Sequence, residues 1–437
     1  MTPIRQITTL ILPFFTLLCA GTGGVAQQPA ASALDGGNAS PQISAQQYVE
    51  QLSHQDRDVR RRAAYLLGRI DAPAEVAVPA LAKALSDRQM ETRWYAIDAL
   101  GHFGEAAAPA VGEIVKALES TLNDADVHRR GAVSLGRIGP AAKEAVPVLE
   151  AALKSDDALY QIAAAQALWR ISQHEAAIGL LSQQAASRDG EIAFAAVVAL
   201  GELGDADQQW TAPLLSALSH EDLDVRHAAA AALAAIGPPA IEPLSRLVAS
   251  RDQQGRAEAA RALGMITDEV RRDILYNNAA SGREFAAAAS PLVRTAFPAL
   301  AGALGEEDPA LRAAAQLALA KGGSAAVIQL LQTLGSEDRS QRTSAAEALI
   351  RAEAYLPKQR PLPENIDRVH ARITETLVAT MQGDDAITQM ATVRLFAALE
   401  IGPAGEAALP YLQQALQTGD LATRRYADRA IDRLQTP

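Results

Sequence analysis

The residues of this chain best suited to chemistry are histidines that stand beside glutamates. The sequence contains seven histidines, and the pairs His174-Glu175 and His220-Glu221 each place an imidazole next to a carboxylate. Both groups bind iron and similar transition metals. The sequence holds no G-x-G-x-x-G, P-loop, H-E-x-x-H, G-x-S-x-G or C-x-x-C motif. It therefore predicts no cofactor and no nucleotide-binding or hydrolytic site. Whether the histidines can bind a metal depends on the elements in which they lie.

Those elements are copies of one repeated sequence motif, which is DLDVRHAAAAALAAIG at Asp222–Gly237. An Arg marks each copy, and copies recur about every 33 residues, as from Arg60 to Arg93. The marker positions are Arg60, Arg93, His128, Gln161, Ala193, Arg226, Arg256, Arg312, Arg342, Met390 and Arg424. Nine of the eleven copies carry Asp four residues before the marker, and nine carry Leu seven residues after it. Such self-similarity predicts a solenoid.

Each recurring position has a physical role in a helix. The Asp is predicted to cap the helix N-terminus, because its carboxylate accepts hydrogen bonds from the first backbone N–H groups and favours the positive end of the helix dipole. An Ala three residues after the marker lets two helices approach, and the Leu fills the space beyond it. Asp and Arg are four residues apart and can pair along the helix, so we interpret both columns as structural. Gly68, Gly101, Gly136, Gly201 and Gly264 are predicted to end the helix.

A second helix follows in each repeat. Val78–Leu85 sets its pattern, with apolar residues at positions i, i+3 and i+7, and similar stretches occur at 146–153, 297–304 and 409–416. The Pro in the second place of each stretch is predicted to lie in the first helical turn, where its missing N–H costs nothing. Each repeat is therefore predicted to be a helical hairpin that buries its apolar face by stacking on its neighbours.

Residues 1–26 are predicted to be a secretory signal peptide. Arg5 supplies the positive start, the apolar run Ile7–Ala20 follows, and Gly24–Ala26 provides a cleavage site of small residues. The apolar run has 14 residues, which is short for a membrane span. The sequence thus predicts an exported protein, periplasmic or secreted. An uncleaved anchor is one alternative, and a lipoprotein modified at Cys19 is another, less favoured because Leu18 is larger than the residue that usually precedes a lipidated Cys.

The remaining chain is acidic and lacks cysteine. The formal net charge of the full chain is −11, and it becomes −12 once Arg5 is removed with residues 1–26. This charge argues against nucleic acid and against an anionic membrane as partners, because neither finds a basic stripe. The absence of cysteine suits an oxidising compartment but provides no disulfide. Residues 27–43 are predicted to be a flexible leader, and Ser44–Leu52 a short helix that caps the first repeat.

The pattern D-x-x-x-R-x-x-A-x-x-x-L-G, followed by A-V-P-x-L-x-x-A-L, resembles HEAT repeats, most closely the short variety named after the phycobilisome lyase subunits. The resemblance covers residues 44–434. It implies an all-α fold, a right-handed α-solenoid of about 11–12 stacked helical hairpins. A HEAT-repeat hydroxylase holds two irons with His-Glu pairs directly after the repeat Arg. Here both pairs lie elsewhere in the repeat, and Ala228 follows His227 where that Glu would stand. The resemblance therefore carries over no metal set.

Two intervals interrupt the repeat. The 56 residues from Arg256 to Arg312 are predicted to hold a second helix over 268–276, an eroded first helix over 283–289 and another second helix over 291–304. The 48 residues from Arg342 to Met390 contain the proline-rich stretch Tyr355–Pro363, which favours an extended loop. The predicted plan is a signal peptide (1–26), a leader (27–43) and a solenoid (44–437) with insertions near 268–290 and 354–365.

The sequence predicts a monomeric scaffold that binds a protein partner, with no small-molecule substrate. The binding face is expected to be an elongated concave surface lined by second helices. Residues expected to point off the apolar stripes towards that face are Lys83, Lys116, Glu150, Arg246, Gln332 and Gln414.

The insertion is a second candidate. Tyr355 and Leu356 are candidate apolar anchors, and Lys358 and Arg360 are candidate contacts for an acidic partner. A solvated, tolerated insertion is the alternative. Trp94 is a further candidate contact residue, although one exposed aromatic is ordinary. Two other functions stay open, a metal-dependent or lyase-like enzyme and a purely structural envelope protein.

Overall fold

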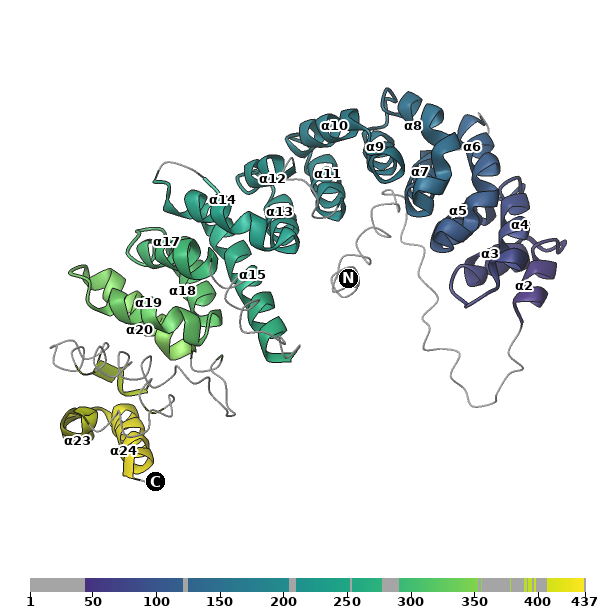
Figure 1. Cartoon of the computed structure of the whole chain (residues 1–437). Coiled ribbons are helices and arrows are strands. Elements are labelled where there is room, and N and C mark those ends of the chain that lie inside the picture. Colours follow the sequence, from purple (N-terminus) through teal and green to yellow (C-terminus); the bar gives the residue numbers. More distant parts are fainter. Residues whose placement is uncertain are drawn as a thin grey trace. The chain divides into compact units, whose positions relative to one another are not determined.

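The computed structural model describes residues 44–120, 125–203, 210–251, 254–276, 291–352 and 407–435, together with single positions between 355 and 397. Every regular element in these ranges is a helix (Figure 1). The chain divides into two compact units, Met1–Pro213 and Leu214–Pro437, called here the first unit and the second unit. The fold is an all-α solenoid, as the repeat predicts. None of the described helices is both long enough and apolar enough to cross a membrane.

In the first unit, each repeat begins with a longer helix. These first helices are α3 (Arg57–Leu67), α5 (Met90–His102), α7 (Ala125–Ile138), α9 (Ala158–Ser172) and α11 (Gly190–Glu202). The second helices are α4 (Ala74–Ala84), α6 (Val111–Glu119), α8 (Val146–Ala152) and α10 (Glu175–Ala185). The next second helix, α12 (Thr211–Ala217), contains the boundary between the two units. The 3₁₀ segments η2 (Gly104–Ala110) and η3 (Gly139–Ala145) precede α6 and α8.

In the second unit, the same alternation continues. The first helices are α13 (Leu223–Ile236), α15 (Arg256–Tyr276), α18 (Pro309–Lys321) and α20 (Arg339–Ala352). The second helices are α14 (Pro238–Ala249), α17 (Phe297–Ala303), which the π-helical turn η5 (Leu292–Ala296) precedes, and α19 (Ser324–Leu334). The last described elements are α23 (Leu409–Thr418) and α24 (Leu421–Gln435).

The Ala and Leu columns form the core, as predicted. The column leucines with no exposed surface are Leu67, Leu100, Leu135, Leu168, Leu200, Leu233, Leu263 and Leu319. Ala63, Ala96, Ala164 and Ala229 of the Ala column are equally buried. Burying one Leu side chain stabilises the fold by about 1.5–3 kcal/mol, so this column supplies much of the free energy that holds consecutive helices together.

The Asp column caps the first helices, which confirms the prediction. The carboxylate of Asp222 accepts backbone N–H groups of Asp224 and Val225 at 2.7 and 3.5 Å. The same cap is present at Asp56, Asp157, Asp189 and Asp308. Each cap satisfies backbone donors that would otherwise lack a partner, a contribution of about 1 kcal/mol.

The marker arginines bind the turn that precedes their helix instead of pairing with the capping Asp. Nη1 of Arg312 donates to the carbonyl oxygens of Glu306 and Glu307 at 2.6 and 2.8 Å. Arg226 and Arg342 make the equivalent two bonds. The guanidinium has several donors in a fixed fork, so one side chain can hold two carbonyls that the turn leaves without partners.

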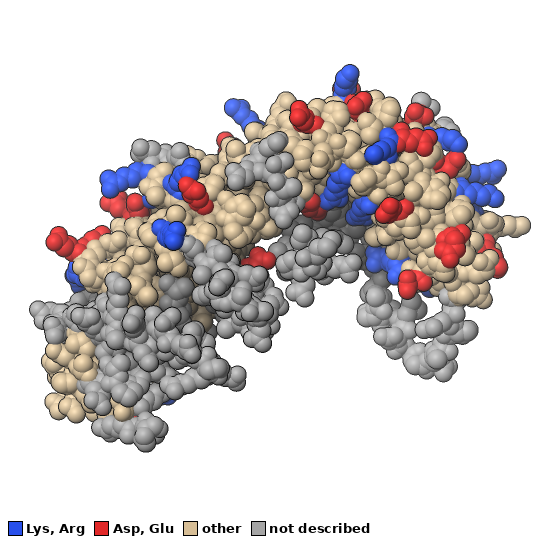
Figure 2. Space-filling view, viewed as in Figure 1, with Lys and Arg blue, Asp and Glu red and all other residues tan. Residues whose placement is uncertain are grey.

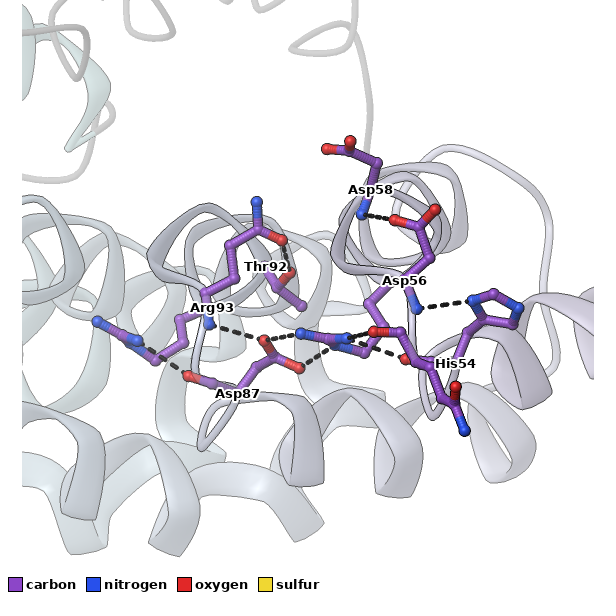
Figure 3. A network of polar contacts seen from close by, with 9 residues as sticks. His54, Asp56, Asp58, Asp87, Thr92 and Arg93 are labelled. Carbon is purple, nitrogen blue, oxygen red and sulfur yellow. Dashed lines mark hydrogen bonds and ion pairs between the residues drawn. The ribbon is translucent and has the colours of Figure 1, made fainter.

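Figure 3 shows such a network in the first repeat. Arg60 donates to the carbonyl oxygens of His54 and Gln55 at 2.9 and 3.0 Å, and to both carboxylate oxygens of Asp87 at 2.6 and 3.1 Å. Burial works against ionisation of Asp87, but the bonds from Arg60 and from the backbone of Gln89 outweigh it, so the pKa of Asp87 is lowered. Asp87 lies in the turn before α5, so the Arg column joins one repeat to the next.

The glycine column lets neighbouring first helices approach closely. Gly101, Gly136 and Gly201 lie in the last turns of α5, α7 and α11, so these helices end where the glycines predict. Gly264 lies deep inside α15, and there the prediction is wrong. A Cβ atom added to Gly101 would lie 2.6 Å from Oγ of Ser134, and one added to Gly136 would lie 3.0 Å from Cα of Ala167. The backbones are so close that a side chain has no room.

The turns use other glycines. α3 also ends at Gly68, as predicted. Positive φ angles occur at Gly104, Gly139, Gly237 and Gly323, which follow the column, and at Gly255, which directly precedes α15. Because L-residues adopt a positive φ only with strain, these are the positions where the backbone itself requires glycine.

The proline prediction holds for three second helices and fails for a fourth. Pro147, Pro298 and Pro410 lie in the first turn of α8, α17 and α23. Pro79 lies inside α4, because that helix already begins at Ala74. A Pro at this point removes one helical hydrogen bond. Burial of the neighbouring side chains of α4 offsets that loss, since the helix packs in the core through Val78 and Leu81.

The interval from Arg256 to Arg312 contains one long first helix where two helices were predicted. α15 runs without a break to Tyr276, so the separate helix predicted over 268–276 is wrong. The reason is that residues 265–276 contain neither Gly nor Pro, so nothing in this stretch stops the helix. η5 and α17 provide the second helix predicted over 291–304, and α17 packs on α14 and α18. The helix predicted over 283–289 lies outside the described residues.

The predicted capping helix is present at the start of the described chain. In α2 (Ala45–Gln51), Ser44 and Gln47 exchange side-chain and backbone hydrogen bonds in a capping box. Leu52 at its end is buried. Residues 1–43 lie outside the described residues, so the signal peptide and the leader stay predictions.

Candidate interaction surface

The candidate residues of the second helices are exposed but do not form a common site. In the first unit, Lys83, Lys116 and Glu150 are exposed on α4, α6 and α8. Nζ of Lys116 pairs with Oε1 of Glu113, one turn away in the same helix, at 2.8 Å. Oε1 of Glu150 lies 3.1 Å from Nε2 of His174. Two of the three therefore contact their own or the adjacent repeat, and none contacts another.

The candidates in the second unit have the same character. Arg246, Gln332 and Gln414 are exposed on α14, α19 and α23. Arg246 forms an ion pair with Glu242 of the same helix. Tyr355 of the insertion is half-buried in a single described position. Leu356, Lys358 and Arg360 lie outside the described residues, so their role stays a prediction.

The histidines serve the local structure. Nδ1 of His54 accepts the backbone N–H of Asp56, and Nδ1 of His220 accepts that of Asp222, both at 3.0 Å. Nε2 of His227 lies 3.0 Å from Nη1 of Arg261. Among the described residues, no three His, Cys, Asp or Glu side chains converge as metal ligands do. The His-Glu pairs therefore belong to turns between helices.

In the first unit, the first helices lie on the inner side of the curve and the second helices on the outer side (Figure 1). The expectation that second helices line the concave surface is wrong for this unit. The Gly and Ala columns explain the difference, because they bring the backbones of consecutive first helices into contact. Because the first helices are packed more closely than the second helices, the stack curves towards the first helices, which form its inner row.

Aromatic side chains join the first two inner helices. The rings of Tyr65 in α3 and Tyr95 in α5 meet edge to face, with 5.3 Å between their centroids. The guanidinium of Arg69 lies 4.5 Å from the Tyr65 ring, within range of a cation–π interaction. The side chain of Tyr65 is 39% exposed. A large aromatic surface is thus open to solvent at the start of the solenoid.

The pattern continues from α5 to α7. The guanidinium of Arg130 lies 5.5 Å from the ring of Trp94 and forms an ion pair with Asp98. Trp94, a candidate contact in the sequence, is half-buried. Burial raises the pKa of Asp98, against the opposing charges of Arg130 and Arg137. Asp98 is therefore a partly desolvated carboxyl group near two arginines.

Cations surround the imidazole of His102 at the end of α5. Its pKa is lowered, mainly by burial and then by the charge of Arg137, while Asp98 raises it and Arg69 lowers it further. Arg69 comes from the preceding repeat and Arg137 from the following one. The three side chains therefore form one row across three repeats. Figure 2 shows Lys and Arg side chains on the visible face of the first unit, interspersed with acidic ones.

This row ends between α9 and α11. Nε2 of Gln166 and Nη2 of Arg170 both donate to Oε2 of Glu202, at 2.9 and 3.0 Å. The carboxylate of Glu202 neutralises Arg170, which is the next cation in the row. The cationic part of the inner surface therefore belongs to α3, α5 and α7.

The composition of three repeat columns already indicates this surface in the sequence, although it matches no catalytic or binding motif. The inner side chains stand two, five and nine residues after the marker in the first three repeats. The nine residues are Arg62, Tyr65 and Arg69, then Tyr95, Asp98 and His102, then Arg130, Val133 and Arg137. Four of the nine are arginines and one is acidic, in a chain whose net charge is −11. This excess of arginine is visible when the same column is compared between repeats. It is not visible in the second helices, because these columns belong to the first helices.

Comparison with known families identifies the repeats. The model for HEAT repeats matches residues 45–118, 178–264 and 211–290. HEAT repeats are thus present in both units. No curated protein is significantly similar in sequence to this chain.

Several solved structures share the fold. Kap121p bound to Pho4p is 14% identical, with a TM-score of 0.50 over 98% of this chain and 49% of that chain. Importin beta in an ammonium sulfate condition is 16% identical, with a TM-score of 0.41 over 89% and 55%. An engineered protein is 24% identical, with a TM-score of 0.34 over 90% and 99%. This chain spans about half the length of the Kap121p chain. At these identities the likeness shows the α-solenoid fold alone.

Proposed function

We propose that this chain is an exported scaffold that binds another protein along the exposed surface of its solenoid. The observation that carries the proposal is the inner face of the first unit, where Tyr65, Trp94 and Arg130 lie on consecutive first helices. Stacking of repeats needs small and apolar residues, which the Ala and Leu columns already provide. Tyr, Trp and Arg are the residues most enriched where proteins bind each other tightly. A purely structural spacer has no need of such a face.

The fold comparison supports this function. Kap121p is a solenoid of the same fold and its structure contains bound Pho4p. The enzyme alternative has weaker support, because the rings of His174 and His220 contact a neighbouring carboxylate and a backbone N–H. Metal analysis of the purified chain tests it directly. Iron in near-stoichiometric amount would contradict a function as scaffold alone.

Affinity capture tests the scaffold function. The full chain, immobilised on beads, is exposed to an envelope extract of its source organism, and bound proteins are identified by mass spectrometry. One protein should bind in stoichiometric amount and be displaced by soluble chain. The control bait is a Leu135→Ala, Leu168→Ala variant, in which the core of the first unit is damaged. Equal recovery on both baits, or no saturable partner, would contradict the proposal.

The insertion is a separate proposed docking element. A matched bait replaces residues 356–363 by a Gly/Ser linker of equal length. Prolines restrict the free loop, so its docking costs less conformational entropy than that of an ordinary loop. Capture of the main partner should fall at least tenfold, a loss of about 1.4 kcal/mol. If this bait captures the partner as well as the parent chain does, the insertion is a tolerated loop.

Export is proposed from residues 1–26. Cell fractionation followed by N-terminal sequencing tests it. The mature chain should be found outside the cytoplasm and should begin at Gln27. A chain that keeps Met1 and fractionates with cytoplasmic proteins would overturn this part of the proposal and leave the scaffold function to be tested by capture.

A further inference from the structure

The inner face of the first unit has the composition of a recognition surface. We call it the aromatic–arginine face, and its members are Tyr65, Arg69, Tyr95, His102, Arg130 and Arg137. Tyr65 and Tyr95 are in edge-to-face contact, and Arg69 lies over the Tyr65 ring. Rings held in this way lose little conformational freedom when a partner docks, which lowers the entropic cost of binding.

Two cations of this face have no acidic partner in the described chain. Asp98 pairs with Arg130. The described residues place no carboxylate within 4.0 Å of Arg69 or of Arg137, although they stand on either side of His102. Other arginines of the first unit form ion pairs, among them Arg60 with Asp87 and Arg170 with Glu202. The charge of Asp98 acts on Arg137, but Asp98 already pairs with Arg130, so Arg69 and Arg137 can each accept a carboxylate from a partner.

The spacing of the repeats fits an extended chain. Helices that pack side by side lie about 8–10 Å apart, and the column nine residues after the marker places Arg69, His102 and Arg137 on consecutive first helices. An extended polypeptide in the polyproline II conformation advances about 3.1 Å per residue and presents every third residue on the same face. About three residues of such a chain therefore span one repeat.

We propose that the aromatic–arginine face binds an acidic, extended segment of another protein, with carboxylates that meet Arg69 and Arg137 and apolar groups that pack on Tyr65 and Tyr95. This inference rests on the proposed scaffold function and names its partner's chemistry. Because the chain as a whole carries a net charge of −11, an acidic segment is repelled elsewhere and directed to this face. Acidic residues at every third position of the segment match the repeat.

Peptide binding to the full chain tests the proposal. The first probe is a fluorescent peptide of about 12 residues, enough for four repeats at about 3.1 Å per residue, with Glu at every third position between Ser and Leu. The second has the same composition with its glutamates contiguous. The third has Gln in place of Glu, and the fourth probe is an oligothymidine of similar length. Fluorescence anisotropy should show tightest binding for the first peptide and weaker binding as salt increases.

The matched variants are Arg69→Ala, Arg137→Ala on the face and Lys154→Ala, Arg188→Ala at two exposed positions of the first unit outside the face. Both pairs remove two cations, so any change in net charge is the same. The face variant should bind the first peptide at least tenfold more weakly, about 1.4 kcal/mol, whereas the control should bind within twofold of the parent. Arg69→Gln, Arg137→Gln removes the charge but keeps a polar side chain and should show the same loss, and circular dichroism verifies that each variant is folded.

Three results would overturn the proposal: equal binding of the Glu and Gln peptides, equal loss in the face and control variants, or tighter binding of oligothymidine than of any peptide. The last would make the face a site for nucleic acid. The capture experiment distinguishes failure of this surface assignment from failure of the proposed scaffold function. If capture from extract yields a partner that the face variant still retains, the scaffold function stands and this surface assignment falls.

Discussion

The first helices α3, α5 and α7 of the first unit share their core columns with α13 and α18 of the second unit, but differ from them in the columns that face solvent. Two, five and nine residues after the marker, α3, α5 and α7 carry mostly Arg, Tyr and His. The corresponding residues of α13 are Ala228, Ala231 and Ala235, of which Ala235 is exposed. In α18 they are Ala314, Leu317 and Lys321. The contrast is with α13 and α18 alone, since α24 again carries Tyr426, Arg429 and Arg433 at these positions. The same helical frame can therefore carry an aromatic and cationic surface in some repeats and small or aliphatic residues in others, because stacking mostly uses other positions than those that meet solvent.

The largest expected effect tests the shared part of that comparison. Leu135→Ala in the first unit and Leu233→Ala in the second should each cost about 2–5 kcal/mol, because both side chains are fully buried. Hydrogen exchange should accelerate around the altered repeat first, since repeats contact mainly their neighbours. Uniform acceleration over the chain for either variant would contradict a stack of locally stabilised repeats.

A glycine in each unit tests the close approach of the inner helices. Gly101→Ala should destabilise the first unit by about 1–3 kcal/mol, because the added methyl meets Ser134 at 2.6 Å. Gly302→Ala in α17 is the matched control, because its methyl would meet nothing within 4 Å. There the gain in helix propensity should stabilise the fold by about 0.5–1 kcal/mol. Chemical denaturation measures both, and a stabilised Gly101→Ala would refute the tight contact.

A third pair separates a structural Arg from one assigned to recognition. Arg312→Ala should lower the free energy of unfolding by about 1–2 kcal/mol, because the carbonyls of Glu306 and Glu307 lose their donor. Arg137→Ala should change it by less than about 0.5 kcal/mol, as expected for a surface substitution that breaks no bond. Urea unfolding of the two variants gives the comparison. An equal loss in both would place Arg137 among the structural residues.

The smallest effect concerns protonation of His102. Its pKa lies below the ordinary 6.5, first because of burial and then because of Arg137. The unfolded chain therefore binds the proton more tightly, so the stability of the first unit should decrease as pH falls through and below about 6.5. Arg137→Ala should raise the pKa of His102 towards its ordinary value and flatten this dependence. NMR titration of the His102 ring measures the shift. An unchanged pKa would show that the charge of Arg137 does not act on His102.

Sequence reasoning identified the fold from local patterns. The Asp caps, the Ala and Leu columns and the capping helix at Ser44 are each set by residues close in sequence, so their roles could be predicted. The Gly column was interpreted only in part, because glycine both ends helices and permits close packing. The second role depends on Ser134 and Ala167, which lie one repeat away. The candidate surface was missed for the same reason, since the inner row depends on contacts between repeats.

By itself, the sequence determined that this protein is an acidic solenoid of helical hairpins, because the helical period and the repeat are properties of the chain alone. Tertiary structure decided which row of helices faces inward in the first unit. Close contacts at Gly101 and Gly136 shorten the spacing of the first helices and bend the stack towards them. That curvature brings Arg69, His102 and Arg137, each some 33 residues apart in sequence, into one electrostatic row.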